Sequence, residues 1–325
     1  MFIEQAFKAK HEFWRYLVGS LIIGTAAVLG QMLVVVAFIF KFISEGKGLD
    51  ELAKLDESNM FKILDSNLLL FLLMFSFVLA LLAIILVLKT IHQQKLKLII
   101  TTRKRLDWKR IWFAFFFWGL LSSGLVLLDF FYLNPDDYAV NFKLNKFIIL
   151  AIIAIVLIPV QTSVEELVFR GYLMQGFGLL AKNRWFPLLM TSLIFGLLHI
   201  GNPEVAKLGY STLIFYIGTG LFLGILTLMD EGMELALGFH AANNLFIALL
   251  VTSDYTAIQT ESILKEVVEP EVSIMDSIVP VFILFPILIF IFAKVYKWKN
   301  WKEKLFGKIK EPPIENDKII VESIN

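Results

Sequence analysis

Residues 163–181 read SVEELVFRGYLMQGFGLLA, a mostly apolar stretch that carries two carboxylates and one guanidinium. The stretch directly follows an apolar run at 147–163, so Glu165, Glu166 and Arg170 stand where a bilayer would surround them. Ionisable side chains inside a membrane are costly and usually mark function. Residues 164–181 are expected either to lie along the membrane interface or to continue the preceding span inside the protein.

The whole chain has the composition of a membrane protein. Of its 325 residues, 58% are apolar and 18% are charged, whereas soluble domains are about 45–50% apolar and about 25% charged. A helix needs about 20 apolar residues to cross a bilayer. Runs near that length occur at 17–40, 67–90, 111–132, 147–163, 186–200, 211–229, 233–250 and 275–296. The sequence predicts an all-α polytopic membrane protein with about eight transmembrane helices.

Charge and cysteine content exclude several classes of function. The formal net charge is +1, without the basic excess of a nucleic-acid binder, so no nucleic acid is expected as a partner. The chain has no cysteine, which excludes disulfides, thiol catalysis and zinc–thiolate sites. A divalent metal such as zinc would have to be held by His, Asp, Glu or Asn.

Lysine and arginine predict the orientation of the spans, because short cytoplasmic loops are rich in them. The loop at 95–110 and the tail at 294–310 are basic, and the loop at 251–273 is acidic. Both termini are therefore expected in the cytoplasm, with the basic segments next to the lipid surface. The loop between the first two spans opposes this orientation, because its lysines would lie outside; they are Lys41, Lys47, Lys54 and Lys62.

The predicted organisation has three parts. A three-span region covers 1–146, a core covers 147–250, and an external acidic loop, a last span and a basic tail cover 251–325. The core contains three polar clusters within apolar runs. They are Glu165, Glu166 and Arg170; His199; and His240 with Asn243 and Asn244.

Helix geometry sorts these groups. Adjacent residues on a helix point about 100° apart, so Glu165 and Glu166 cannot face one point. Glu166 and Arg170 are four residues apart in the favourable order, which pairs them and leaves Glu165 free. His240 and Asn244 are also four residues apart and can meet one object. Phe195, four residues before His199, is expected to pack beside its ring.

This set of groups suits hydrolysis by an activated water. Glu165 can act as general base, His199 can orient the water, and His240 with Asn244 can donate to the oxyanion of a peptide-bond intermediate. In a metal-assisted version, Glu165, His199 and His240 would be ligands and leave a position open for water. The spacing in the sequence does not choose between the two versions.

Three segments carry a resemblance to a known family. Glu165-Glu166-Leu-Val-Phe-Arg170 resembles EExxxR, Phe195-Gly-Leu-Leu-His199 resembles FxxxH, and His240-Ala-Ala-Asn-Asn244 resembles HxxxN. These motifs occur in this order in the CPBP family of intramembrane proteases, which includes CAAX prenyl endopeptidases and Abi proteins. The resemblance covers about residues 147–250.

The resemblance implies an endopeptidase with an active-site cavity inside the membrane, acting on membrane-tethered protein or peptide substrates. It implies catalytic roles for Glu165, His199 and His240 and an oxyanion role for Asn244. It also suggests an integral protein of a bacterial plasma membrane. The three catalytic groups can meet only if residues 160–180 dip back into the bilayer or the span at 186–200 is tilted or displaced. We expect residues 164–181 to be immersed in the bundle, with Pro159 as a candidate for the kink.

The same residues also allow other interpretations than a protease. HExxH and GxGD are absent, and Ser211 with His240 could only imitate a serine–histidine dyad. Buried Glu, Arg and His can also form the proton relay of a coupled transporter, although no inverted repeat is visible. A non-catalytic scaffold or immunity protein built on the same fold is the third alternative.

Overall fold

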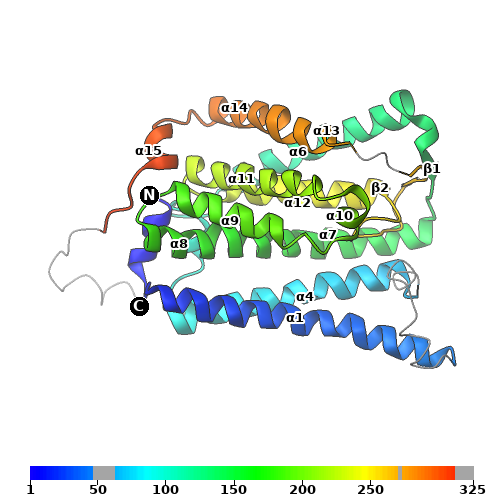
Figure 1. The fold of residues 1–325 in the computed structure, drawn as a ribbon, viewed down its shortest axis with the longest axis horizontal. Coiled ribbons are helices and arrows are strands. Elements are labelled where there is room, and N and C mark those ends of the chain that lie inside the picture. The colour runs from blue at the N-terminus through cyan, green and yellow to red at the C-terminus, as the bar shows by residue number, and fades with distance from the viewer. Residues whose placement is uncertain (47–62, 270–272, 312–325) are drawn as a thin grey trace.

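The computed structural model describes residues 1–46, 63–269 and 273–311, and most of them are helical (Figure 1). The helices are α1 (Phe13–Ser44), α4 (Ser66–Val87), α5 (Lys97–Ile100), α6 (Trp108–Leu128), α7 (Leu144–Glu166), α8 (Met174–Ala181), α9 (Trp185–Leu197), α10 (Pro203–Leu208), α11 (Thr212–Asp230), α12 (Glu234–Leu250), α13 (Met275–Val279), α14 (Phe285–Val295) and α15 (Trp301–Phe306). A 3-10 helix at Ile3–Lys8 precedes them.

Short strands close one end of the bundle. β1 (Tyr138–Val140), β2 (Val251–Thr252) and β3 (Leu264–Glu266) form one small sheet in the order β1-β3-β2. β3 pairs antiparallel with β1 and parallel with β2. The sheet thereby ties the chain between α6 and α7 to the chain that follows α12.

The long helices confirm a polytopic all-α membrane protein. Within the described residues, six helical stretches are long and apolar enough to cross a membrane; they are Phe13–Ser44, Ser66–His92, Trp108–Leu133, Leu144–Ala181, Thr212–Asp230 and Met275–Val295. α9 and α12 coincide with two of the eight predicted runs, but they are shorter apolar helices. The described residues thus contain six helices of full length and two shorter ones, so the predicted count of about eight transmembrane helices is not confirmed.

Residues 164–181 continue the fourth span. α7 passes through a π-type segment at Leu167–Leu173 into α8, and together they form one helical stretch of 38 residues. At about 1.5 Å per residue, Glu165 lies roughly 32 Å from the start of that stretch at Leu144. Many side chains after Glu166 are buried. The segment is immersed in the bundle, as predicted, and does not lie flat outside it.

The irregularity in this long helix falls after Glu166 and not at Pro159. α7 remains α-helical through Pro159, where the Thr162 hydroxyl donates to the Ile158 carbonyl at 3.1 Å. The π-type turn begins at Leu167 and includes Arg170 and Gly171. Such π segments often occur at functional sites, and this one carries the arginine of the first motif.

The basic segments and the acidic loop lie at opposite ends of the bundle. The basic segment before α6 meets the turn between α11 and α12, where Thr101 bridges Gly232. The N-terminal segment and the basic tail reach the same end, through Lys10–His92 and Asn183–Lys308 backbone contacts. The small sheet and the acidic loop occupy the opposite end (Figure 1). Of the opposing lysines in the first loop, Lys47, Lys54 and Lys62 lie outside the described residues.

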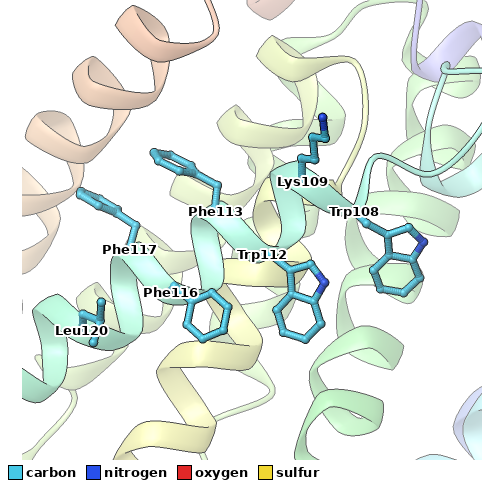
Figure 2. A pocket seen from close by; sticks show the side chains of 7 residues that line it. All are labelled: Trp108, Lys109, Trp112, Phe113, Phe116, Phe117 and Leu120. Carbon is cyan, nitrogen blue, oxygen red and sulfur yellow. The ribbon is translucent and has the colours of Figure 1, made fainter.

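Two surface hollows lie away from the three motifs. One, of about 590 Å³, follows the outer face of α6, and Figure 2 shows that all its lining side chains project from this helix. The other, of about 370 Å³, lies between the N-terminal segment, α8 and the basic tail. Neither hollow is lined by Glu165, His199 or His240.

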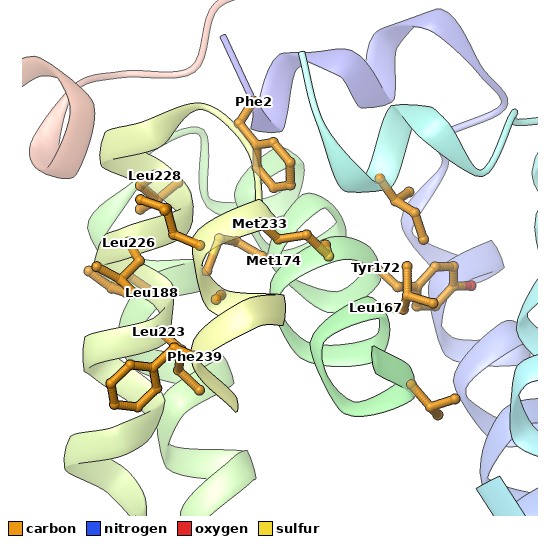
Figure 3. Close-up of a cluster of buried hydrophobic side chains, with 14 of the residues drawn as sticks. Phe2, Leu167, Tyr172, Met174, Leu188, Leu223, Leu226, Leu228, Met233 and Phe239 are labelled. Carbon is orange, nitrogen blue, oxygen red and sulfur yellow. The ribbon is translucent and has the colours of Figure 1, made fainter. Parts of the chain in front are cut away.

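The main core joins segments that are distant in the sequence. Phe2 from the N-terminus, Leu167 and Tyr172 from the fourth span, and Phe239 from α12 belong to one buried apolar cluster (Figure 3). The same cluster includes Phe292 of α14. Residues on both sides of the predicted 147–250 core thus pack into it, which holds the helices that carry the motifs.

Glycines permit the closest helix approaches around the motifs. A Cβ at Gly238 of α12 would lie 2.1 Å from the Ile111 carbonyl oxygen of α6, and one at Gly196 of α9 would lie 2.3 Å from Ile217 of α11. Glycine at these positions lets backbone meet backbone without a clash. Gly238 and Gly196 directly precede parts of the chain that carry His240 and His199.

We expect Gly238→Ala to destabilise the protein by about 1–3 kcal/mol, because the added methyl group must push α6 and α12 apart. Gly124→Ala is the matched control, since Gly124 lies in the other helix of this pair, α6, but has open space where its Cβ would be. The measurement is the thermal midpoint of each variant in the same detergent. Equal midpoints for both variants would show that the α6–α12 contact does not depend on the glycine.

Candidate active site

The two adjacent glutamates have different surroundings. Glu166 is fully buried and its Oε1 accepts from the Arg170 guanidinium at 3.0 Å, which confirms the predicted pair. The same oxygen accepts from Nδ1 of His240 at 2.8 Å. The side chain of Glu165 remains 16% exposed and lies on the other side of His240. The structure therefore separates a fully buried carboxylate from one whose side chain remains partly exposed.

Arg170 is held on three sides. Besides Glu166, its guanidinium donates to the Gly220 carbonyl of α11 at 3.3 Å and stands 4.6 Å from the centroid of the Phe195 ring. Cation–π attraction operates at that separation. A Cβ at Gly220 would lie 2.8 Å from Cα of Ser192, so glycine lets α9 approach α11 beside this buried cation.

His240 lies between the two carboxylates. Because the Glu166 carboxylate accepts at Nδ1, that nitrogen carries the proton, and Nε2 points toward Glu165 Oε2 at 3.5 Å. The imidazole is buried and has a fixed orientation. The sequence placed His240 beside Asn244, but it did not reveal that Glu166 is the group that orients the ring.

His199 joins the site through Phe195. Its Nδ1 donates to the Phe195 carbonyl at 2.7 Å, and the two rings lie 4.8 Å apart, as predicted from their spacing. The Phe195 ring also lies 6.2 Å from the His240 ring. Phe195 therefore stands between the two imidazoles. Within the described residues, no hydrogen bond links His199 directly to Glu165 or His240.

Asn244 belongs to a ladder of polar side chains. Its Nδ2 donates to Gln161 Oε1 at 3.1 Å, and its Oδ1 accepts from Asn243 at 3.1 Å. Asn243 in turn accepts from the indole of Trp118 at 3.1 Å. Gln161 was missed in the sequence, although it lies four residues before Glu165 in an apolar run and so shares its helix face.

The donor geometry does not form a three-ligand metal centre. Ligands of zinc converge on the ion at about 2.0–2.3 Å, and among the described residues no three His, Asp or Glu side chains gather in this way. Both nitrogens of His240 already face carboxylates. As they lie, the candidate ligands Glu165, His199 and His240 do not gather around one point that a metal ion could occupy.

The serine alternative has no geometric support. Ser211 lies at the start of α11, and no hydrogen bond joins it to His240 in the described part of the chain. His240 instead has carboxylate partners on both ring nitrogens. A serine nucleophile needs the imidazole as its own base within hydrogen-bond reach, so this pairing is excluded from the site.

Comparisons with known proteins agree with the motifs. A family model described as "Type II CAAX prenyl endopeptidase Rce1-like" matches residues 144–246. The uncharacterized protein YyaK of Bacillus subtilis is 33% identical over 249 residues, which are 75% of this chain and 80% of that protein. No solved structure gives a significant match.

The polytopic helical fold and the family model that covers the three motifs indicate a class of protein, the intramembrane proteases. Within that class, the chain belongs to the CPBP family, which contains the Rce1-like CAAX prenyl endopeptidases. The resemblance carried by the three motifs is thereby confirmed at the level of the family. All three motifs lie within the matched residues.

We expect Glu166→Gln to destabilise the protein by about 3–5 kcal/mol, because it leaves the Arg170 cation buried without its partner. Glu12→Gln is the control: Glu12 also pairs with an arginine, Arg15, and this hydrogen bond lowers the pKa of Glu12 to about 2, but its carboxylate is solvent-exposed. Thermal unfolding in detergent measures both. If Glu166→Gln has the same thermal midpoint as the wild type, the buried Glu166–Arg170 pair does not stabilise the fold by the expected amount.

Proposed function

We propose that this protein is an intramembrane endopeptidase in which a water activated by Glu165 hydrolyses a peptide bond. The observation that carries the proposal is the position of the Glu165 carboxylate. It is the partly exposed acid of the pair and stands 3.5 Å from Nε2 of a histidine that a buried carboxylate orients. This arrangement gives a base, an oriented imidazole and access for water at one point.

The proposed reaction uses the residues in this order. Glu165 takes a proton from water, and the hydroxide attacks the carbonyl carbon. His199, with its proton fixed on Nδ1 by the Phe195 carbonyl, accepts a hydrogen bond from the water at Nε2. Glu165 then passes its proton to the leaving amine as the C–N bond breaks. The free acid and amine leave, and Glu165 is again ionised.

The oxyanion of the intermediate needs donors. One hydrogen on Asn244 Nδ2 is committed to Gln161, and the second is free to point at the intermediate. His240 Nε2 lies on the same helix one turn away and donates when it carries a proton. Removal of one oxyanion donor from other hydrolases costs about 10²–10³ in kcat, and a comparable loss is the expectation for Asn244→Ala.

The proposed substrates are membrane-associated proteins or peptides. Glu165 lies in the fourth span, His240 and Asn244 lie in the shorter apolar helix α12, and His199 follows α9. A substrate must therefore reach this site from the lipid or from a bilayer surface. The matched family is described by cleavage of CAAX prenyl proteins. Comparison of prenylated and unprenylated substrates tests whether this chain recognises an isoprenoid.

We expect Glu165→Gln to abolish cleavage while the protein still folds, because the amide cannot accept a proton from water. The experiment compares newly formed peptide ends of membrane proteins in cells that produce wild type or Glu165→Gln. Peptides found only with the wild type are then cleaved with purified protein in liposomes. Prenylated and unprenylated forms of the same peptide report on the lipid group.

Glu12→Gln is the matched control and should cleave like the wild type. A chelator of divalent metals should leave the rate unchanged, as the metal-free version requires. Full cleavage by Glu165→Gln would reject the proposal. A cellular phenotype retained by Glu165→Gln without any cleavage would favour the non-catalytic scaffold, and proton-coupled solute uptake lost in that variant would favour the transporter.

We propose further that the end that carries the N-terminal segment and the basic tail is cytoplasmic, in the plasma membrane of a bacterium. The basic segments gather at this end and the acidic loop at the other, which is the distribution that short loops show. Because the chain lacks cysteine, single cysteines can report on each side. We expect Glu269→Cys, but not Lys104→Cys, to react with a membrane-impermeant maleimide in intact cells; the reverse labelling would invert the proposed orientation.

A further inference from the structure

His199 lies in the turn that follows α9, where a helix no longer fixes its ring. Its imidazole donates a hydrogen bond from Nδ1 to the Phe195 carbonyl. That bond sets the tautomer, but one hydrogen bond leaves the imidazole free to swing about it. The chemistry proposed for His199 requires Nε2 to keep a constant direction, so the faces of the ring need support.

Tyr216 of α11 supplies that support. Its ring is stacked on the imidazole, with centroids 4.1 Å apart and planes 20° apart. On another side stands the Phe195 ring, tilted by 54°. The close approach of α9 and α11 at Gly196 brings Tyr216 to this distance, because a Cβ there would collide with Ile217, the residue next to Tyr216.

Glu204 of α10 holds Tyr216 in turn. The Tyr216 hydroxyl donates a short hydrogen bond to Glu204 Oε1, which also accepts from Asn202 Nδ2 at 2.9 Å. The second oxygen of Glu204 accepts from the backbone N–H of Ala257 at 2.9 Å. Ala257 belongs to the acidic loop after β2. A single carboxylate therefore connects the loop that caps this end of the bundle to the ring stacked on His199.

We propose that Tyr216 and Glu204 are positioning residues for His199: Tyr216 holds the imidazole by stacking, and Glu204 fixes Tyr216 while clasping the loop at Ala257. The inference rests on the proposed function for the role of His199 in catalysis. The geometric claim stands by itself, because it concerns only how freely one imidazole moves. Neither residue lies in the three motifs.

The reactivity of His199 toward diethyl pyrocarbonate tests the claim without any substrate. The reagent modifies an unprotonated imidazole nitrogen, and peptide mapping by mass spectrometry separates the four histidines. We expect Tyr216→Leu to raise the modification rate of His199 about three- to tenfold, the factor that a stacked aromatic pair is worth. Tyr216→Phe keeps the ring but loses the hydroxyl that bonds Glu204, so we expect it to raise the rate measurably, but by less than Tyr216→Leu.

A double-mutant cycle tests the link to Glu204. Tyr216→Phe and Glu204→Ala each break the same hydrogen bond, so the double variant should change His199 reactivity no more than the larger single effect. Tyr210→Phe, at an exposed tyrosine in the preceding turn, is the control and should match the wild type. Once a cleaved peptide is identified, we expect Tyr216→Leu to lower kcat for that peptide about tenfold or more and to leave KM within about twofold of the wild-type value.

The outcomes separate this inference from the proposed function. An unchanged His199 rate in folded Tyr216→Leu, or fully additive effects in the cycle, overturns the positioning role. If Tyr216→Leu does not fold, the cycle of the milder variants decides. If His199 reactivity changes as expected while no peptide is ever cleaved in a Glu165-dependent way, the positioning role stands and the protease proposal fails.

Discussion

The structure depends on the single oxygen of Glu166 that accepts from both Arg170 and His240. A buried guanidinium and a buried imidazole would each be costly without a partner, and one carboxylate serves both. Because Glu166 and Arg170 sit one turn apart on the fourth span while His240 comes from α12, this contact joins local helix geometry to tertiary packing. The neighbouring Glu165 takes no part in the ion pair with Arg170, and its side chain remains partly exposed.

The glycines explain how short helices can reach that contact. α9 and α12 are too short to span a bilayer alone, so they are stable in a membrane only if longer helices surround their ends. Gly196, Gly220 and Gly238 let them press against α11 and α6 at backbone distance. The same contacts set the depth of Phe195 and His240. The packing that stabilises these two short helices in the membrane therefore also sets the positions of the motif residues that they carry.

Sequence reasoning reached the helical class, the Glu166–Arg170 pair and the packing of Phe195 on His199, because these follow from composition and from spacings of four residues. It could not reach contacts between helices, whose register depends on side-chain packing. Gln161 with Asn244, Trp118 with Asn243 and Tyr216 with His199 are all of this kind. In the sequence, Trp118 lies within the apolar run at 111–132, away from the interfaces where tryptophan anchors usually lie.

Two glutamates next to each other in the chain thus come to have opposite tasks. Their chemistry is identical, and the 100° step of the helix gives one the Arg170 side and the other the exposed side. If Glu166 were the base, its proton transfer would disturb the ion pair that holds Arg170 and His240 in place. If Glu165 is the base, every change of charge during turnover falls on the group with access to water, and the buried framework keeps its charges. In the proposed mechanism the roles of the two glutamates therefore follow from their burial, and turnover would leave intact the contact that orients His240.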